Sequence, residues 1–430
     1  MWRAFGGGLR RTAAIAFAAG VLGGCRRPAS VHADAPAVPR DAGPPVMAAS
    51  PTTKSFYAQS FSRRPRPDEM TELGRALFAD PQLSAFGNMS CASCHAPKFA
   101  YGPPNDRATQ LGGPALKTPG LRAAPSLRYL QAVPSFSEHH YDESADDSLD
   151  QGPTGGHDWD GRAASAHEQA RGPLTSPFEM ANPDVETVVA RLARGPLAAR
   201  FRAVFGDDVF REANRGTAAL LMCLEVFQQS PKDFSPFSSR YDRYLAHQGT
   251  LTPAEQRGLA LFNDAKKGNC AACHPSGLRK GAFPLFTDFG FGALAVPRNR
   301  ALPANADPAF HDLGLCGPVR TDLAGHPDYC GQFRVPSLRN VALRRAFFHN
   351  GVFHRLDQVL DFYAERDTNP RRFYPRTGGA FDDLPAAYAK NANREPPFGG
   401  KPGAAPALTR AERRDIVSFL QALTDADLAR

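Results

Sequence analysis

Two C-x-x-C-H motifs constrain this chain more than any other feature of its sequence. In both copies a histidine directly follows the second cysteine: Cys91, Cys94 and His95, and then Cys270, Cys273 and His274. A zinc ribbon also uses cysteine pairs, but its pairs lie close together and need no adjacent histidine. A redox dithiol is expected on a βαβ unit, and the sequence has no convincing run of strands. The motifs therefore predict two covalently bound haem c groups, each attached by two thiols and ligated by the histidine.

The sequence leading into each motif is duplicated, which predicts two homologous domains. Residues 68–95 and 251–274 both run from an acidic start through a short amphipathic helix, with "LGRALF" or "RGLALF", into the motif. Segments with helical periodicity follow in each half, and the 38 glycines and 39 prolines indicate long loops. We therefore expect an all-α fold of two cytochrome c-like helical domains with long loops, 66–240 and 241–430, each binding one covalent haem.

The N-terminal segment has the pattern of an export signal. Three arginines precede an apolar stretch, and "LGGC" ends at Cys25. This predicts residues 1–25 as a signal peptide of the lipoprotein type, with a lipid on Cys25 as the only membrane contact. The alternative is ordinary cleavage, which leaves a periplasmic protein without an anchor. Residues 26–65 are rich in Pro and Ala and are expected to form a tether.

Charge and apolar patterning exclude two other classes of protein. The chain has 51 Lys and Arg against 43 Asp and Glu, a net charge of +8 with no basic block, so no nucleic-acid partner is expected. No internal apolar stretch is long enough to span a bilayer, so the body of the protein is not expected to cross a membrane.

Three cysteines outside the motifs have structural interpretations. Cys316 and Cys330 either form a disulfide in an oxidising compartment or remain thiols, because sequence alone does not fix pairing. Cys223 lies in an apolar helical segment and is expected to be a buried structural thiol.

The methionines restrict the ligand opposite His274. All of them lie N-terminal to the second motif, the last being Met222, so the second haem has no methionine ligand in its own domain. An iron with two strong ligands carries electrons, whereas an iron with an open face binds peroxide, so this position affects the chemistry. The candidates that remain are a tyrosine or one of four histidines: His311, His326, His349 and His354.

Four segments together resemble the bacterial di-haem cytochrome c peroxidases and, within that superfamily, the MauG-like branch. They follow the family's order over roughly residues 66–428 and read "LGRALFADPQLSAFGNMSCASCH", "WDGRAASAHEQARGPLTSPFEM", "FRVPSLRNVALRRAFFHNGVFHRLDQVLDFY" and "LTRAERRDIVSFLQALTD". The resemblance implies an enzyme that reduces hydrogen peroxide at the N-terminal haem, with electrons relayed through the C-terminal haem.

The resemblance assigns the peroxide site to the N-terminal domain. His95 would be the proximal ligand, and Gln169, Pro173 and Glu179 in "QARGPLTSPFE" match the family's distal residues. A carboxylate suits this role because peroxide cleavage needs a proton taken from one oxygen and given to the other. The alternative for Glu179 is an exposed glutamate near the start of a helix.

The resemblance also implies roles for four residues at the second haem and between the haems. Trp159, in "WDGR", matches a tryptophan that relays electrons; otherwise it is a plain core residue. His274 and Tyr363, in "LDFYAE", would ligate the second iron from opposite sides, and a phenolate ligand favours oxidised iron. Without the resemblance, Tyr363 is a core aromatic residue of an amphipathic helix. Arg339, in "VPSLRN", is expected to bind haem.

The resemblance leaves open whether one calcium ion is bound. Family members usually hold calcium between their domains through an asparagine side chain and two backbone carbonyls. In this chain the asparagine position is matched to Tyr129, and the carbonyl positions carry Arg344 and Ala346. Backbone carbonyls survive such changes, whereas the side-chain ligand does not.

Two kinds of enzyme and one carrier fit these features. A peroxidase would take electrons from a small cytochrome c or a cupredoxin, whereas a MauG-like enzyme would use peroxide to oxidise residues of a partner protein. Tyr363 favours MauG-like iron chemistry. The alternative outside enzymes is a di-haem electron carrier, and the distal set of Gln169, Pro173 and Glu179 argues against it.

Overall fold

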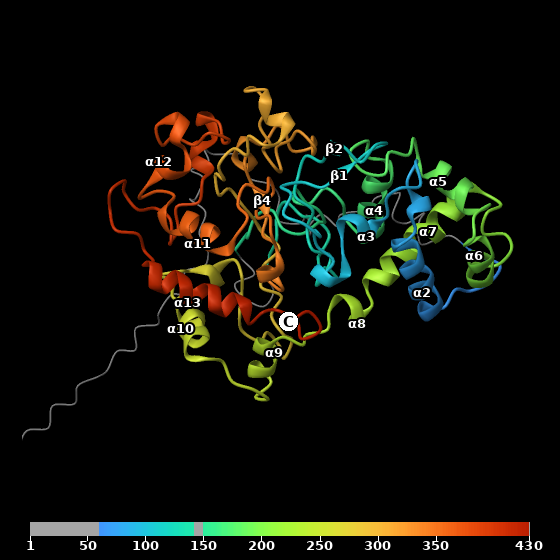
Figure 1. The fold of residues 1–430 in the computed structure, drawn as a ribbon, viewed down its shortest axis with the longest axis horizontal. Coiled ribbons are helices and arrows are strands. Elements are labelled where there is room, and N and C mark those ends of the chain that lie inside the picture. The colour runs from blue at the N-terminus through green and yellow to red at the C-terminus, as the bar shows by residue number, and fades with distance from the viewer. Residues whose placement is uncertain (1–59, 142–148, 430) are drawn as a thin grey trace, which may run out of the picture. The chain divides into compact units, whose positions relative to one another are not determined.

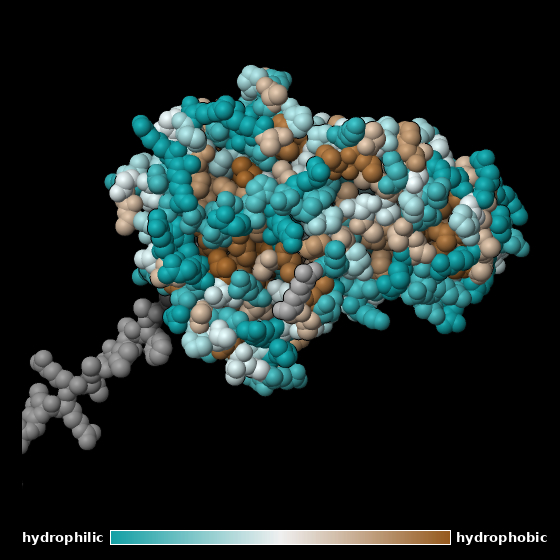
Figure 2. All heavy atoms as spheres, in the orientation of Figure 1, coloured by the Kyte–Doolittle hydropathy of each residue, from teal (hydrophilic) through white to brown (hydrophobic). Residues whose placement is uncertain are grey.

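The computed structural model describes residues 60–141 and 149–429. The predicted signal peptide, the lipid anchor at Cys25 and most of the predicted tether lie outside the described residues. Within the described part, no helix is both long and apolar enough to cross a bilayer. Figure 2 shows hydrophilic side chains over much of the visible face, with apolar side chains in separate patches.

The described chain is mainly helical, as the sequence predicts, and its strands form two short antiparallel pairs (Figure 1). β1 (Leu111–Gly112) pairs with β2 (Thr118–Pro119), and β3 (Phe291–Gly292) pairs with β4 (Phe333–Arg334). The α-helices are α2 (Pro67–Phe78), α3 (Cys91–Cys94), α4 (Ala166–Thr175), α5 (Val185–Leu192), α6 (Ala198–Phe205), α7 (Ala213–Gln228), α8 (Pro231–Phe234), α9 (Arg240–Leu245), α10 (Pro253–Asn263), α11 (Leu356–Glu365), α12 (Pro370–Phe373) and α13 (Arg410–Gln421). The all-α class is therefore confirmed.

The duplicated segment has the same packing role in each half of the chain. In "LGRALF" of α2, a side chain at Gly74 would collide with the backbone carbonyl of Cys223 in α7. In "RGLALF" of α10, a side chain at Gly258 would collide with the carbonyl of Asp415 in α13. Each glycine thus allows close contact between the helix before a motif and a later helix, and Figure 1 shows both pairs.

Two separate hydrophobic cores surround these helix pairs. The larger core is built from side chains between Met70 and Leu224, and it includes Cys223, which is fully buried as expected. A second core is built from side chains between Tyr241 and Leu423. In the second pair both helices begin with a capping box, formed by Thr252 and Glu255 in α10 and by Thr409 and Glu412 in α13.

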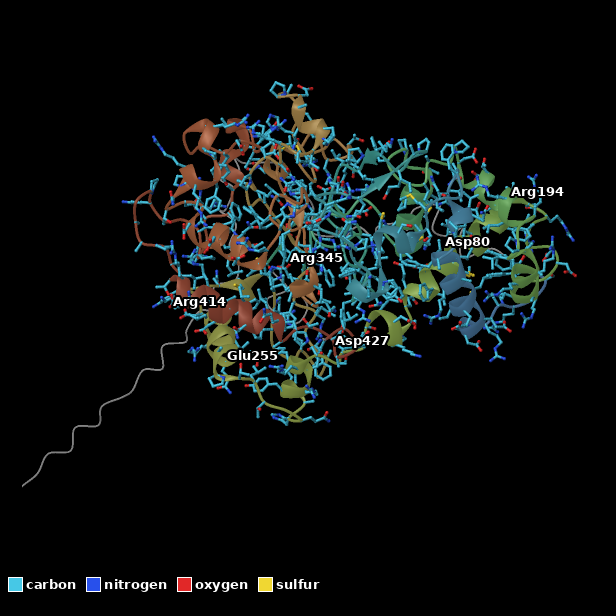
Figure 3. The ribbon with its side chains drawn as sticks, viewed as in Figure 1. Asp80, Arg194, Glu255, Arg345, Arg414 and Asp427 are labelled. Carbon is cyan, nitrogen blue, oxygen red and sulfur yellow. A yellow bond between two sulfur atoms is a disulfide. The ribbon has the colours of Figure 1, made fainter. Side chains whose placement is uncertain are left out.

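A buried carboxylate near the C-terminus joins the two halves. Asp425 is fully buried and accepts hydrogen bonds from Arg128 Nη1 at 2.8 Å, Tyr129 Oη at 2.6 Å and Asn340 Nδ2 at 2.7 Å. Asp427, which Figure 3 labels, also pairs with Arg128. Because each buried polar group has a partner, the network stabilises the contact between segments that are far apart in sequence.

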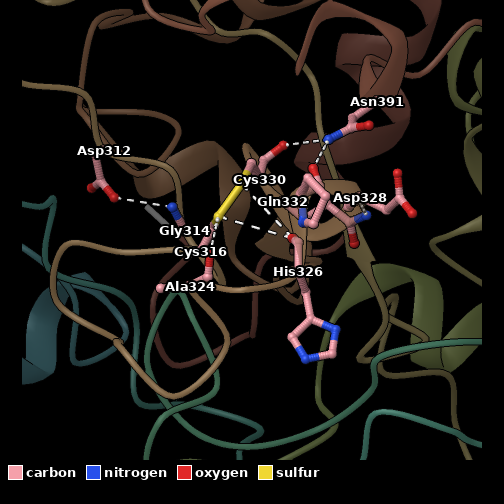
Figure 4. Close-up of a disulfide and its surroundings, with 10 residues drawn as sticks. Asp312, Gly314, Cys316, Ala324, His326, Asp328, Cys330, Gln332 and Asn391 are labelled. Atoms are coloured by element: carbon pink, nitrogen blue, oxygen red, sulfur yellow. Dashed lines mark hydrogen bonds between the residues drawn. A yellow bond between two sulfur atoms is a disulfide. The ribbon is translucent and has the colours of Figure 1, made fainter. Parts of the chain in front are cut away.

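Cys316 and Cys330 form a disulfide, so of the two alternatives left by the sequence the structure has the cross-link. The Cα atoms are 4.7 Å apart (Figure 4). Asn391 donates from Nδ2 to the backbone carbonyls of Pro327 at 2.8 Å and Cys330 at 3.0 Å, which ties the cross-linked loop to residues near the C-terminal end.

We expect Tyr129→Phe to lower the free energy of unfolding by about 1–3 kcal/mol. The change removes the hydroxyl that donates to Asp425 and accepts the backbone N–H of Phe237 at 3.1 Å, and it leaves both buried groups without that partner. Urea unfolding followed by far-UV circular dichroism measures the change. Tyr141→Phe, at an exposed position, is the control and should stay within about 0.5 kcal/mol. Equal stability of the two variants would contradict the network's role.

Candidate functional site

The first motif forms a single helical turn that brings its three functional side chains together. Ser90 and Ser93 form a capping box at the start of α3, and the backbone N–H of His95 donates to the carbonyl of Cys91 at 2.9 Å. His95 Nδ1 lies 3.1 Å from the carbonyl of Tyr101. A carbonyl only accepts, so Nδ1 must carry the proton, and Nε2 is left with a lone pair.

The second motif repeats this arrangement. Cys270–Ala272 form a turn of 3-10 helix, and the backbone N–H of His274 donates to the carbonyl of Cys270 at 2.8 Å. His274 Nδ1 lies 2.7 Å from the carbonyl of Phe286, so its Nε2 also keeps the lone pair. Desolvation lowers the pKa of both motif histidines to about 4, which keeps the imidazoles neutral at neutral pH.

These features fit covalent haem at both motifs. A metal-binding histidine needs one neutral ring nitrogen with a lone pair, and its other nitrogen is usually fixed by a hydrogen bond. The motif cysteines are not in disulfides. Burial raises the pKa of Cys91, Cys94 and Cys270 to about 12, so these side chains are protonated thiols at neutral pH.

A pocket joins the first motif to the predicted distal residues. Its lining includes both cysteines and the histidine of the motif, together with Gln169, Pro173 and Glu179. Apolar side chains fill much of the remaining wall, among them Phe78, Met89, Leu127, Leu174, Met180 and Leu224. An apolar pocket with a few polar groups is the usual form of a cofactor or substrate site.

Helix α4 and the turn after it position the distal residues. Gln169 and Pro173 are four residues apart in α4, so they lie on one face of the helix. Glu179 follows in a turn, where its own backbone N–H donates to Ser176 O at 3.0 Å. Strand β1 holds this turn from outside: a side chain at Gly112 would collide with Phe178 O, and Gly113 N donates to Glu179 O at 2.8 Å.

Asp158 is a residue of this site that the sequence interpretation missed. It accepts a hydrogen bond from Gln169 Nε2 at 3.1 Å and pairs with Arg162 at 2.9 Å. Because the amide nitrogen of Gln169 faces Asp158, its carbonyl oxygen is directed elsewhere. Burial raises the pKa of Glu179, and the negative charge of Asp158 raises it further. No local sequence pattern indicates this contact, because Asp158 and Gln169 are eleven residues apart.

Trp159 lies where segments from both halves of the chain meet. Its indole Nε1 donates to the carbonyl of Ala123 at 2.7 Å, and its own carbonyl accepts the N–H of Arg334 at 2.8 Å. The side chain does not line the pocket of the first motif. It is therefore fixed between residues of the first half and strand β4 of the second.

Tyr363 lies beside the second motif. Its ring stacks on Phe398, with centroids 5.1 Å apart, and contacts Phe348. Burial and then the neighbouring thiols of Cys270 and Cys273 raise the pKa of its hydroxyl. Its role as an iron ligand stays a prediction, and among the rival histidines the buried His349 has an Nε2 atom without a hydrogen-bond partner.

The four histidine candidates have other surroundings. His311 Nδ1 donates to Asp383 O, exposed His354 donates to Arg345 O, and buried His349 stacks on Phe333 with centroids 3.6 Å apart. The remaining candidate, His326, stacks on Tyr329.

Arg339 is buried in an ion pair rather than in the pocket. Its Nη atoms lie 2.8 and 3.0 Å from the carboxylate oxygens of Asp242, and Nε donates to Pro284 O at 2.8 Å. Its guanidinium also lies 4.6 Å above the rings of Tyr129 and Phe237. Its role in haem binding stays a prediction.

Comparison with known proteins gives consistent matches. The sequence profile of "Di-haem cytochrome c peroxidase" matches residues 68–250. The chain is 33% identical over 386 residues to the methylamine utilization protein MauG of Paracoccus denitrificans, covering 84% of this chain and 90% of that protein. It is 28% identical over 326 residues to cytochrome c551 peroxidase of Nitrosomonas europaea, covering 74% of this chain and 78% of that protein.

Solved structures agree. The diheme peroxidase BthA of Burkholderia thailandensis is similar with a TM-score of 0.75 and 41% identity, covering 86% of this chain and 89% of BthA. A MauG-like protein associated with microbial copper homeostasis gives a TM-score of 0.60 and 26% identity, covering 86% of this chain and 95% of that structure.

The profile match contains the first motif, the matches to the relatives and to the solved structures extend over both motifs, and the resemblance seen in the sequence is confirmed. Membership implies two haem c groups and the enzyme class of oxidoreductases, and the two motifs have the thiols and neutral imidazoles that such groups require. This chain belongs to the family of di-haem cytochrome c peroxidases and MauG proteins.

Proposed function

We propose that this chain is an exported di-haem c-type peroxidase that reduces hydrogen peroxide at the haem of the first motif. The observation that carries the proposal is that one pocket is lined both by this motif and by Gln169, Pro173 and Glu179. The haem supplies an iron centre that binds peroxide and accepts its oxidising equivalents.

Glu179 is the proton-transferring group of this proposal. Its carboxyl group faces the pocket, and its raised pKa brings it closer to neutral pH, where a general acid–base group works best. The carboxylate takes the proton from one peroxide oxygen and returns it to the other, from which water leaves. Pro173 has no backbone N–H and presents an apolar ring to the same pocket, which limits competing water.

Gln169 orients the proton transfer through its contact with Asp158. Since its amide nitrogen donates to that carboxylate, its carbonyl oxygen is available as an acceptor in the pocket. An acceptor there binds the proton-bearing side of peroxide or of a protonated Glu179. Asp158 thus supports the site without lining it.

The second haem and Trp159 complete the electron path in this proposal. His274 and Tyr363 are the proposed ligands, which is supported by the interaction of the Tyr363 hydroxyl with the thiols of the second motif. Trp159 is the proposed relay, supported by its hydrogen bond to Ala123 and the contact of its carbonyl with Arg334. Arg339 is proposed to hold the second site through the buried Asp242 pair.

The electron donor is proposed to be a small cytochrome c or a cupredoxin. The alternative, oxidation of residues of a partner protein, is favoured by Tyr363 beside the second motif and by the similarity to the MauG proteins. A periplasmic location, with a lipid anchor at Cys25, rests on the sequence pattern of the first 25 residues. The domain boundary at 240/241 is supported by the two hydrophobic cores.

We expect Glu179→Gln to slow the reaction with peroxide by about 100-fold or more, because the amide cannot transfer the proton. Stopped-flow absorbance measures the rate, and a pyridine haemochrome assay should find two haems in both proteins. Glu186→Gln, at an exposed position of α5, is the control. A rate close to that of the unsubstituted protein would contradict the role of Glu179, and an absence of any spectral change with stoichiometric peroxide would favour the electron carrier.

Asp158→Asn should move the pH dependence of the peroxide reaction to lower pH. Removing the negative charge lowers the pKa of Glu179, so its basic form persists further into the acidic range before the rate falls. Rates measured from acidic to neutral pH report the shift. Asp207→Asn, at an exposed position, should leave the profile unchanged. An unshifted Asp158→Asn profile would show that this charge does not act on the proton-transferring group.

Tyr363→Phe should change the low-spin haem signal in electron paramagnetic resonance and the absorbance spectrum, because it removes the proposed oxygen ligand. Both haems should remain attached, since the cysteines are intact. Tyr244→Phe, at an exposed position of α9 in the same half, is the matched control. Identical spectra for the Tyr363 variant and the unsubstituted protein would rule out phenolate ligation.

A further inference from the structure

Arg344 connects the two halves of the chain through backbone carbonyls. It follows the turn Val341–Leu343, and its Nε donates to Ala346 O at 3.2 Å. Its Nη2 donates to Ala124 O, also at 3.2 Å, across a separation of 220 residues. One guanidinium therefore binds a carbonyl from each half.

The half-buried guanidinium of Arg344 has no carboxylate partner among the described residues, whereas three other arginines with largely buried side chains do. Arg122, Arg128 and Arg366 each pair with aspartate. For Arg344, desolvation alone lowers the pKa to about 10, and no acidic group raises it. The side chain stays charged at neutral pH, although a desolvated charge without an ionic partner costs stability.

The charge lies close to the first motif. Three residues after Ala124, the backbone N–H of Leu127 donates at 3.2 Å to Tyr101 O, the carbonyl that also accepts from His95 Nδ1. The segment that Arg344 binds is therefore hydrogen-bonded to the carbonyl that fixes the His95 ring, and a charge held there affects a metal that the ring binds.

The same residues do not fit the calcium ion that the resemblance left open. The side chain at the expected asparagine position, Tyr129, is a buried phenol bonded to Asp425 and to Phe237 N. The carbonyl of Ala346 is already bonded to the guanidinium of Arg344. The place where family members hold calcium is therefore occupied by the positively charged guanidinium of Arg344, which binds carbonyls of both halves.

We infer that Arg344 is a built-in cation that links the two halves and raises the reduction potential of the haem bound by His95, without calcium. The inference rests on the proposed function, in which His95 ligates the peroxide-reactive haem. A nearby positive charge favours reduced iron over oxidised iron, because the reduced form carries one positive charge fewer. Arg344 is a positioning residue, since it acts through the backbone and through its charge.

Spectroelectrochemical titration of the intact di-haem protein tests this. Arg344→Gln and Arg344→Met remove the charge, and each should lower the ratio of reduced to oxidised first haem at a fixed applied potential by on the order of tenfold. Arg344→Lys keeps the charge and should stay near the unsubstituted value. Arg345→Gln, an exposed neighbour labelled in Figure 3, is the control and should not shift the ratio. EDTA and added calcium should leave the unsubstituted protein unchanged.

Three outcomes would overturn the inference. If the first haem of Arg344→Gln has the same reduction potential as in the unsubstituted protein, the side chain of Arg344 acts only through its hydrogen bonds. If Arg344→Lys shifts as far as Arg344→Met, the effect follows packing and not charge. If EDTA lowers the reduction potential of the first haem in the unsubstituted protein, a bound metal supplies the charge. This measurement does not depend on whether any variant folds. Each of these results leaves the proposed function intact when the protein still reacts with peroxide, whereas a protein without any peroxide-reactive haem overturns the function itself.

Discussion

The hydrogen bond from each motif histidine to a backbone carbonyl is the constraint on which both sites depend. Tyr101 O and Phe286 O each accept from an Nδ1 atom, so the proton is fixed on one ring nitrogen and the lone pair on the other. The surrounding protein removes water from both rings and keeps them neutral. A histidine that kept its proton on the other nitrogen would not bind iron in this orientation.

The rest of the fold holds these carbonyls and rings in place. Gly74 and Gly258 let the helix before each motif approach a later helix, which sets where the motif emerges. In the first half the chain then passes through β1, α4 and the turn at Glu179, and residues of α4 and of this turn line a pocket over the motif. Beside the second motif lies Tyr363, whose ring stacks on Phe398. The two similar halves thus surround their motifs with different chemistry.

Sequence reasoning succeeded where short spacing determines geometry. A C-x-x-C-H motif places its side chains on one turn in any fold, and residues four apart, such as Gln169 and Pro173, share a face of any helix. It failed for Asp158, because nothing in the local pattern shows that this carboxylate meets Gln169 eleven residues later. It also left the Cys316–Cys330 pairing open, since pairing depends on a Cα separation that only the folded loop fixes.

The sequence by itself determined the helical class and the two haem motifs, because these follow from periodicity and spacing over a few residues, and its resemblance to the family singled out Gln169, Pro173 and Glu179 as the predicted distal residues. The tertiary structure alone decided which carbonyls fix the histidines, how Asp158 acts on Glu179, and how Arg344 reaches Ala124 and Ala346. Those contacts join residues far apart in the chain. Their strength depends on burial and desolvation, which exist only once the two halves have folded against each other.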